Sequence, residues 1–401
     1  MLQFIEKGTV TSTPGFKAAG IFCGIKKKKK DLALIYSEEP CTAAGTFTLN
    51  KVKAAPLLIS RYIINEGKKI RAVLVNSGNA NACTGDQGYN DALESQKLAA
   101  EKLNLKPDEI LISSTGVIGK KLPMEKLKSG INKIVNHLSE CGGIDAAEAI
   151  LTTDTRIKSF AIKIKLGSGG ITIGGICKGS GMIAPNMATM LGFITTDAII
   201  ETSLLQKLLS EAVGESFNKI SVDGECSTND MVIAMANGRS NIAILENTID
   251  CQLFKDGLNT LCLEMAKSIV ADGEGATKLV KISVKNAKSK LDADLVGKSI
   301  ANSSLVKTAI YGQDANWGRI LSAAGQSGAD IIPEKVSIHF DKLPVLLPNY
   351  NLALDEESAL KILMRPEFEI NVDLGIGTEE TTWWTCDLTE QYVKINSDYR
   401  T

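Results

Sequence analysis

Apolar and polar residues follow patterns along this chain that predict strands and one hairpin. Residues 71–75 (RAVLV) form an apolar run that enters an Asn/Gly-rich loop, as a buried strand does. Residues 160–166 alternate, and the turn at 167–170 (GSGG) leads into a second apolar run at 171–177. This pattern predicts a hairpin that delivers the chain to Lys178. Three further strands are predicted at 280–284, 368–374 and 381–388.

Helical spacing of apolar residues indicates a second set of elements between these strands. Helices are predicted at 91–105, 124–138, 203–219, 252–270 and 297–311. Because strands and helices are mixed without a regular order, the sequence predicts an α+β layered protein rather than a βαβ wind. The polar stretch 285–295 is the best candidate for a domain boundary in the sequence.

The composition argues against nucleic acid and the membrane as binding partners. The chain has 401 residues, enough for two domains, and 44% of them are hydrophobic and 23% charged, as in ordinary globular proteins. A formal net charge of −1 argues against a basic nucleic-acid binder, so the lysine run 26–30 is interpreted as a solvated turn. The uncharged stretch 179–196 contains Gly, Pro, Asn and Thr, which argues against a membrane span, and residues 1–8 do not resemble a signal peptide.

Cysteines and histidines indicate the compartment and exclude some chemistry. There are nine cysteines, an odd number without a C-x-x-C pair, which predicts reduced thiols and a cytoplasmic location. The two histidines, His137 and His339, lie far from any clustered ligand pattern. We therefore expect neither a metal site nor a serine–histidine triad.

Two Gly-rich segments invite a nucleotide-binding interpretation and do not fit one. Residues 114–122 (STGVIGKKL) have Ser114 and Lys121 where a phosphate loop needs Gly and Ser or Thr. In residues 167–175 the third position of a dinucleotide motif falls on Thr172. The tripeptide STG at 114–116 is either an ordinary turn or a place where hydrogen-bond donors face a developing oxyanion.

The longest uncharged stretch has two interpretations. Residues 178–193 (KGSGMIAPNMATMLGF) are Lys178 and most of the uncharged stretch 179–196. They could simply be a buried loop, or they could surround a nucleophile at Thr189. A threonine hydroxyl needs a base beside it, and an α-amine with a pKa of about 7.7–8.0 could serve. Thr189 would carry such an amine only after the Ala188–Thr189 bond is cut. Residue chemistry alone leaves both interpretations open.

A family resemblance favours the second interpretation. Residues 178–198 resemble the signature of the glutamate N-acetyltransferase / ornithine acetyltransferase family, bifunctional enzymes of arginine biosynthesis. The resemblance covers the whole chain, through residues 15–35, 76–85 (NSGNANACTG), 114–119 (STGVIG), 151–155 (LTTDT), 221–230 (SVDGECSTND), 272–278 (DGEGATK), 316–320 (NWGRI) and 386–401. The chain departs mildly from the family near Ala315 and Trp383.

The resemblance implies a fold and an assembly. The precursor would cut itself before Thr189 into an α chain, residues 1–188, and a β chain, residues 189–401. The expected fold is α+β, a layered α-β-β-α sandwich with a smaller C-terminal α/β domain from about residue 285. Two α and two β chains would assemble into a heterotetramer.

The resemblance also implies an activity with named residues. The acetyl group of N2-acetylornithine would pass to glutamate through an ester on Thr189, with Thr115 and Gly116 as the oxyanion hole. Lys178 would meet a substrate carboxylate and Glu274 a substrate ammonium. The implied substrate-binding residues are Thr152, Lys178, Thr189, Glu274, Asn396 and Thr401, with Thr153 as the neighbour that could be confused with Thr152. No cofactor is expected, and acetyl-CoA stays open as a second donor.

Two other function classes are kept beside this one. An amidohydrolase or aminopeptidase of related fold, with an N-terminal threonine, would use water in place of glutamate as the acceptor. A non-catalytic binding protein for small anions would use the Gly/Asn loops and would have no need of self-cleavage.

Overall fold

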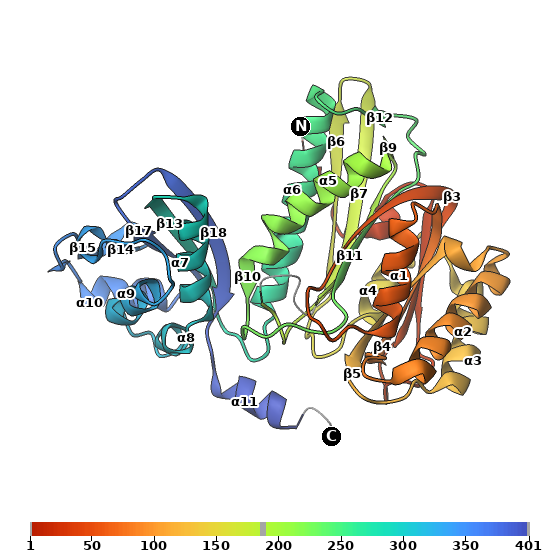
Figure 1. Ribbon diagram of the computed structural model, residues 1–401, viewed down its shortest axis with the longest axis horizontal. Helices are drawn as coiled ribbons and strands as arrows, with labels where there is room; N and C mark the ends of the chain where they lie inside the picture. Colours follow the sequence, from red (N-terminus) through yellow and green to blue (C-terminus); the bar gives the residue numbers. More distant parts are fainter. Residues whose placement is uncertain (1, 185–189, 399–401) are drawn as a thin grey trace. The chain divides into compact units, whose positions relative to one another are not determined.

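The computed structural model describes residues 2–184 and 190–398, which form two compact units (Figure 1). The first unit comprises Met1–Met182, Asn186–Asn218 and Glu225–Ile269. The second comprises Ile183–Pro185, Lys219–Gly224 and Val270–Thr401. The polar stretch 285–295 lies inside the second unit, where it ends one strand and begins a helix. The predicted cut between Ala188 and Thr189 falls outside the described residues.

One mixed sheet forms the centre of the first unit. Its strands are β1 (Leu2–Phe4), β2 (Phe16–Ile21), β3 (Leu32–Phe47), β4 (Ile70–Asn79), β5 (Ile110–Val117), β6 (Lys158–Leu166), β7 (Gly169–Lys178), β8 (Leu191–Thr196) and β11 (Met231–Ala236). They follow the order β1-β6-β7-β8-β11-β3-β4-β5, and β2 pairs with β3. The long β3 joins two groups of strands, because its residues 32–36 pair with β2 and β4 while its residues 42–47 pair with β11.

Helices cover these strands. They are α1 (Ala55–Asn65), α2 (Gly85–Leu103), α3 (Met124–Ile134), α4 (Gly143–Ala149), α5 (Thr202–Gly214) and α6 (Ile249–Ala271). Helices α1 and α2 pack on β5, α4 on β2 and β3, and α5 on β3 and β11. In α6, Met265 packs so closely against β7 that a Cβ at Gly175 would lie 2.8 Å from its sulfur.

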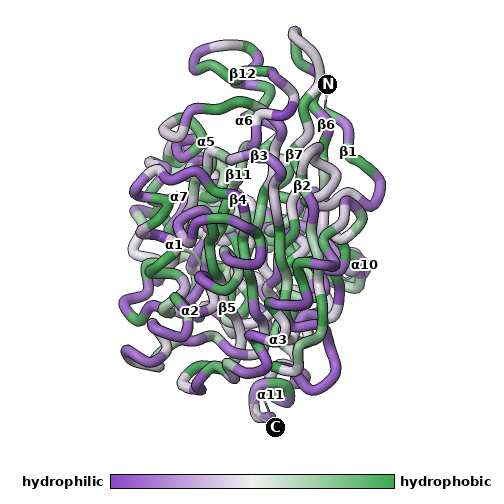
Figure 2. The backbone as a smooth tube through the Cα atoms, turned by 90° about the vertical axis from the view of Figure 1, so that its right-hand side faces the viewer, coloured by the Kyte–Doolittle hydropathy of each residue, from purple (hydrophilic) through white to green (hydrophobic). Residues whose placement is uncertain are grey.

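One large apolar cluster includes residues from both groups of strands. Buried residues of β8 and β11, such as Phe193 and Ile233, belong to the same cluster as those of β3, β4 and β5. Figure 2 shows the hydrophobic segments concentrated in the strands and the hydrophilic ones in the outer loops. The layered sandwich of helices and strands predicted from the resemblance is confirmed.

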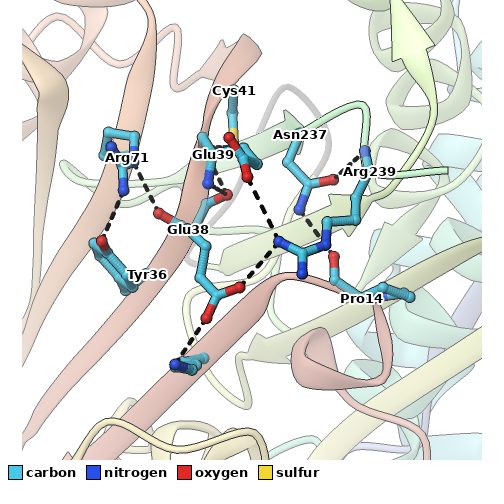
Figure 3. A network of polar contacts seen from close by, with 10 residues as sticks. Pro14, Tyr36, Glu38, Glu39, Cys41, Arg71, Asn237 and Arg239 are labelled. Atoms are coloured by element: carbon cyan, nitrogen blue, oxygen red, sulfur yellow. Dashed lines mark hydrogen bonds and ion pairs between the residues drawn. The ribbon is translucent and has the colours of Figure 1, made fainter. Parts of the chain in front are cut away.

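An exposed polar network holds the segment that follows the C-terminal end of β11 (Figure 3). Arg239 lies 3.1 Å from Glu38 and 3.5 Å from Glu39, two neighbouring residues of β3. Asn237 donates to the Pro14 carbonyl at 2.9 Å. Because 46% of the Arg239 side chain is exposed, each of these ion pairs stabilises the unit by no more than about 1 kcal/mol.

The second unit is a sheet with helices of its own. Its strands are β10 (Ile220–Ser221), β13 (Leu279–Ala287), β14 (Ser337–Phe340), β15 (Leu343–Leu347), β16 (Asn351–Leu352), β17 (Glu367–Asp373) and β18 (Glu379–Cys386), in the order β10-β18-β13-β17-β14-β15-β16. Its helices are α7 (Lys290–Asn302), α8 (Ser304–Tyr311), α9 (Trp317–Gly325), α10 (Glu356–Leu363) and α11 (Glu390–Ser397). Helix α7 packs on β13 and β18 over a separate apolar core.

The helix predicted at 297–311 is wrong in one respect, since two helices occupy this region. Ser303 interrupts them, and its side chain accepts a hydrogen bond from the Val306 N–H at 3.3 Å, which caps α8. Gly297 lies inside α7 rather than at its start. A Cβ there would lie 2.3 Å from the Trp383 ring, so glycine allows the helix to contact β18 closely.

The strand at 71–75 and the hairpin at 160–177 are confirmed, as β4 and as β6 with β7, the latter pair in register from Lys158 opposite Cys177. The two-stranded sheet of β9 (Ile199–Ile200) and β12 (Ala243–Ile244) was not predicted. Among the described residues, no helix has both the length and the apolar character needed to cross a bilayer.

Candidate active site

Lys178 and Thr115 meet in the first unit. Lys178 is the last residue of β7 and Thr115 lies near the end of β5, and each side chain is only 2% exposed. The Lys178 Nζ donates a hydrogen bond to the Thr115 Oγ1 at 3.4 Å. The two residues are far apart in sequence, so the fold brings together two members of the predicted site.

Gly116, the other predicted oxyanion residue, lies where two backbones approach closely. Gly116 has φ of +131°, and the paired Gly78 of β4 has φ of +95°. A Cβ at Gly116 would lie 2.4 Å from the Gly78 carbonyl carbon, so no other residue fits without moving the backbone. The close approach of the two backbones therefore requires glycine at position 116, in addition to the predicted role of this residue in the oxyanion hole.

Buried amides hold the same turn in place. The Asn229 side chain donates to the Ser114 carbonyl, and the Ser114 hydroxyl donates to Asn76 on β4. Asn76 in turn donates to the Asn79 carbonyl at 2.9 Å. Because these polar groups are buried and bonded to each other, residues 114–116 are held in one geometry.

Asp154 connects Thr152 to Lys178, and the sequence analysis did not single it out. Its carboxyl accepts hydrogen bonds from the Thr152 N–H at 3.0 Å, the Gly179 N–H at 2.7 Å and the Lys158 Nζ at 2.8 Å. Burial alone would raise the pKa of this carboxyl. The charges of Lys178 and Lys158, with these hydrogen bonds, hold the pKa well below its usual range, so Asp154 is ionised.

Asp230 is a second buried carboxyl under the influence of Lys178, and the sequence analysis missed it too. It precedes β11 and is 1% exposed. Neither carboxyl oxygen has a hydrogen-bond partner among the described residues. Burial raises the pKa of Asp230 well above its usual range, although Lys178, the Met190 backbone and the Thr48 hydroxyl act to lower it. Burial therefore disfavours the ionised form of this carboxyl.

Lys26 corrects the interpretation of the lysine run as a solvated turn. Lys27, Lys28 and Lys29 are exposed, but Lys26 is half-buried and its Nζ donates to the Leu151 carbonyl at 2.8 Å. Burial lowers the pKa of Lys26 to about 8, and its causes include the nearby charges of Asp154 and Lys178. Lys26 thus belongs to the same charged cluster. The sequence could not distinguish Lys26 from the other lysines of the run 26–30.

Glu274 and Asn396 form a separate group in the second unit. The Asn396 Nδ2 donates to Glu274 Oε2 at 2.8 Å and to the Tyr392 carbonyl at 3.0 Å. Asn396 is exposed on α11, whereas Glu274 is buried in the loop before β13. The remaining predicted site residues, Ala188, Thr189 and Thr401, lie outside the described residues.

The cluster in the first unit has the chemistry of an anion-binding centre. Its three basic side chains, Lys26, Lys158 and Lys178, outnumber Asp154 and Asp31, the two carboxyl groups whose charges act on them. A buried excess of positive charge attracts a carboxylate or a developing oxyanion strongly, because the surroundings have a low dielectric constant. Among the described residues, no group of His, Cys, Asp and Glu side chains is arranged to hold a metal ion.

Comparison with known proteins gives long matches. Residues 17–401 match the model of the ArgJ family. The "Arginine biosynthesis bifunctional protein ArgJ" of Streptococcus thermophilus strain CNRZ 1066 is 48% identical over 395 residues, 98% of this chain and 99% of the relative. The protein of that name from Oceanobacillus iheyensis is 45% identical over 401 residues, 100% of this chain and 98% of the relative.

Solved structures also match. A chain of the ornithine acetyltransferase from Mycobacterium tuberculosis, complexed with ornithine, is 39% identical with a TM-score of 0.44, and the match covers 46% of this chain and 98% of that one. A chain of the arginine biosynthesis bifunctional protein argJ from Bacillus halodurans is 43% identical with a TM-score of 0.44, covering 47% of this chain and 98% of that one.

Proposed function

The chain belongs to the ArgJ family, and we propose that it transfers the acetyl group of N2-acetylornithine to glutamate through an ester on Thr189. As a member of this family it is an acetyltransferase of arginine biosynthesis that acts on small molecules. The observation that carries the proposal is the contact of 3.4 Å between the Lys178 Nζ and the Thr115 Oγ1, in a buried centre that also holds Gly116 and Thr152.

The first half of the reaction forms the acetyl ester. The Thr189 Oγ attacks the acetyl carbonyl, and its proton passes to the Thr189 α-amine, which exists once the Ala188–Thr189 bond is cut. The oxyanion is stabilised by Thr115 and Gly116, and loss of one such donor typically raises a barrier by about 2.7–4 kcal/mol. The amine then gives the proton to the departing nitrogen of ornithine.

The second half of the reaction returns the acetyl group to nitrogen. The glutamate amine attacks the ester carbonyl, the bond to the Thr189 Oγ breaks, and the same two oxyanion donors act again. No cofactor takes part, and acetyl-CoA would be an alternative donor for the same ester.

Substrate charges match the two groups of residues. Lys178 would hold a substrate carboxylate, in line with the excess of positive charge around it. Glu274 would meet a substrate ammonium, and its hydrogen bond with Asn396 would orient the carboxylate for this. Thr152 and the chain end at Thr401 complete the proposed binding set.

The proposed assembly consists of two α and two β chains, residues 1–188 and 189–401, in the cytoplasm. The state of the thiols supports a reducing compartment. All nine cysteines are free thiols, and five of them are buried. Free thiols are typical of proteins in a reducing compartment.

The test uses three forms of the full chain: wild type, Thr189→Ala and Thr189→Ser. Intact mass should show chains 1–188 and 189–401 for wild type and a single chain for Thr189→Ala, which lacks the attacking hydroxyl. Thr189→Ser is the matched control, because it keeps the hydroxyl and should be cut and active at a reduced rate.

Activity is measured as N-acetylglutamate formed from N2-acetylornithine, with acetate release measured in parallel. Transfer to glutamate without release of acetate supports the proposal, and acetate release independent of glutamate would indicate the amidohydrolase instead. A single uncut chain with full activity would rule out the ester on a freed Thr189.

A further inference from the structure

The loop between β2 and β3, residues 22–31, is organised around one buried carboxyl. Asp31 is 0% exposed, and its carboxyl accepts hydrogen bonds from the Cys23 N–H at 2.6 Å, the Gly24 N–H at 3.0 Å and the Lys26 N–H at 2.9 Å. Hydrogen bonds to a charged acceptor are stronger than those to a neutral one. The backbone of Lys26 is therefore fixed before its side chain makes any contact.

The aliphatic part of the Lys26 side chain packs against the backbone that supports the proposed oxyanion hole. A Cβ added at Gly78 would lie 2.8 Å from the Lys26 Cγ, so the lysine lies directly over this glycine. Gly78 of β4 pairs with Gly116 of β5. The Ser77 N–H also donates to the Asp31 carbonyl at 2.9 Å, which attaches the loop to the same strand.

The ammonium group of Lys26 contacts a different segment, residues 151–155. Its Nζ donates to the Leu151 carbonyl at 2.8 Å, and the Thr152 N–H donates to the Asp154 carboxyl at 3.0 Å. The Leu151 carbonyl and the Thr152 N–H belong to one planar peptide group. This peptide is therefore held at its oxygen by Lys26 and at its nitrogen by Asp154, which fixes its orientation.

Strand β4 holds the neighbouring residues at a second point. The Ser77 hydroxyl donates to the Ala149 carbonyl, at the end of α4, at 2.5 Å. Ser77 thus holds the end of α4, while Lys26 holds the peptide that leads into Thr152. The place of Thr152 relative to Gly78 and its partner Gly116 consequently depends on a side chain that contacts both segments.

We propose that Lys26 is a positioning residue for the transfer reaction, which holds Thr152 in place relative to the turn at residues 114–116. Its ammonium group acts through the peptide between Leu151 and Thr152, and its aliphatic part acts through Gly78. Loss of the ammonium group alone should weaken substrate binding and leave the chemical step intact. The inference rests on the proposed function, because it takes Thr152 as a substrate-binding residue.

The test measures N-acetylglutamate formation from N2-acetylornithine by the full chain carrying Lys26→Met. Methionine keeps most of the aliphatic part over Gly78 and removes the ammonium group. We expect KM for N2-acetylornithine to rise at least about tenfold and kcat to change less than about threefold. Lys28→Met is the matched control, because it makes the same substitution at an exposed lysine of the same run, and both constants should stay at their wild-type values.

A double-mutant cycle with Thr152→Val shows whether Lys26 acts through Thr152. Valine keeps the shape of the side chain and lacks the hydroxyl. In the Thr152→Val background, Lys26→Met should raise KM by less than about threefold, because the group that Lys26 positions is already absent. A tenfold rise in both backgrounds would show that Lys26 acts independently of Thr152 and would overturn the inference.

Lys26→Gln keeps the inference testable if Lys26→Met does not fold, which circular dichroism would show. The glutamine amide nitrogen ends one bond short of the lysine Nζ, so KM should again rise at least about tenfold. A wild-type KM in the folded variant would overturn the role of Lys26. A wild-type chain that forms no N-acetylglutamate from N2-acetylornithine would instead overturn the proposed function itself.

Discussion

Two segments of the first unit each place a buried aspartate near Lys178, and the pKa values of the two carboxyls are shifted in opposite directions. Asp154 accepts hydrogen bonds from Lys158 and the Thr152 N–H of its own segment and from the Gly179 N–H that follows β7, so it is ionised. Among the described residues, both carboxyl oxygens of Asp230 lack a hydrogen-bond partner, and burial raises the pKa of this carboxyl well above its usual range. The same residue type, near the same lysine, has its pKa lowered in one segment and raised in the other.

This difference shows how to assign roles to buried acids. Where environments push two pKa values apart, the group that stays ionised is suited to holding charges in place, and the group that stays neutral is suited to giving a proton. Asp154 anchors Thr152, Lys158 and Gly179. The Asp230 carboxyl makes no comparable hydrogen bond among the described residues.

The largest expected effect is on stability. Asp154→Asn leaves Lys158 buried without its counter-charge, so the first unit should lose about 3–5 kcal/mol of unfolding free energy. Asp230→Asn leaves no buried lysine without its counter-charge, so it should not destabilise the first unit in this way. Urea unfolding followed by circular dichroism measures both.

The three tryptophans provide an internal reference for that experiment, because Trp317, Trp383 and Trp384 all belong to the second unit. Their fluorescence transition should be the same in both variants. Equal losses of stability in Asp154→Asn and Asp230→Asn would contradict the contrast between the two segments.

A smaller effect is expected from removing the lysine that both aspartates share. Lys178→Met takes away the proposed partner of the substrate carboxylate, so KM for N2-acetylornithine should rise at least about tenfold, a loss of about 1.4 kcal/mol. Steady-state kinetics measure this. Lys163→Met is the control, because Lys163 is exposed on β6. Unchanged kinetics in Lys178→Met would remove this lysine from the site.

The smallest effect is the pH dependence of stability, which should differ in sign for the two carboxyls. The folded pKa of Asp154 is lowered, so its contribution is present above the unfolded value of about 3.9 and is lost as pH falls through the folded pKa. The folded pKa of Asp230 is raised, so its contribution is present below about 3.9 and is lost as pH rises through the folded pKa.

Stability of wild type and of the two variants, measured at several pH values, tests these signs. Asp154→Asn should fall furthest behind wild type at neutral pH. Asp230→Asn should gain on wild type as pH rises, by at most about 1.4 kcal/mol per pH unit. Parallel curves for all three proteins would show that neither carboxyl has the state assigned to it.

Local elements were the most predictable part of the fold. The strand at 71–75 and the hairpin that ends at Lys178 follow from periodicity, because each has a buried face and a clear turn. The division between α7 and α8 was not predicted, since the cap at Ser303 and the contact of Gly297 with Trp383 depend on local hydrogen bonding and on a distant strand.

The sequence by itself determined the family, the element types and the identity of the proposed nucleophile, because motifs and periodicity are properties of neighbouring residues. Only the tertiary structure decided in which direction the pKa of each carboxyl is shifted. Asp154 and Asp230 are 76 positions apart by residue number, and both stand in motifs rich in Thr and Ser. Their pKa values depend on burial and on partners supplied by other strands, and a linear pattern contains neither quantity.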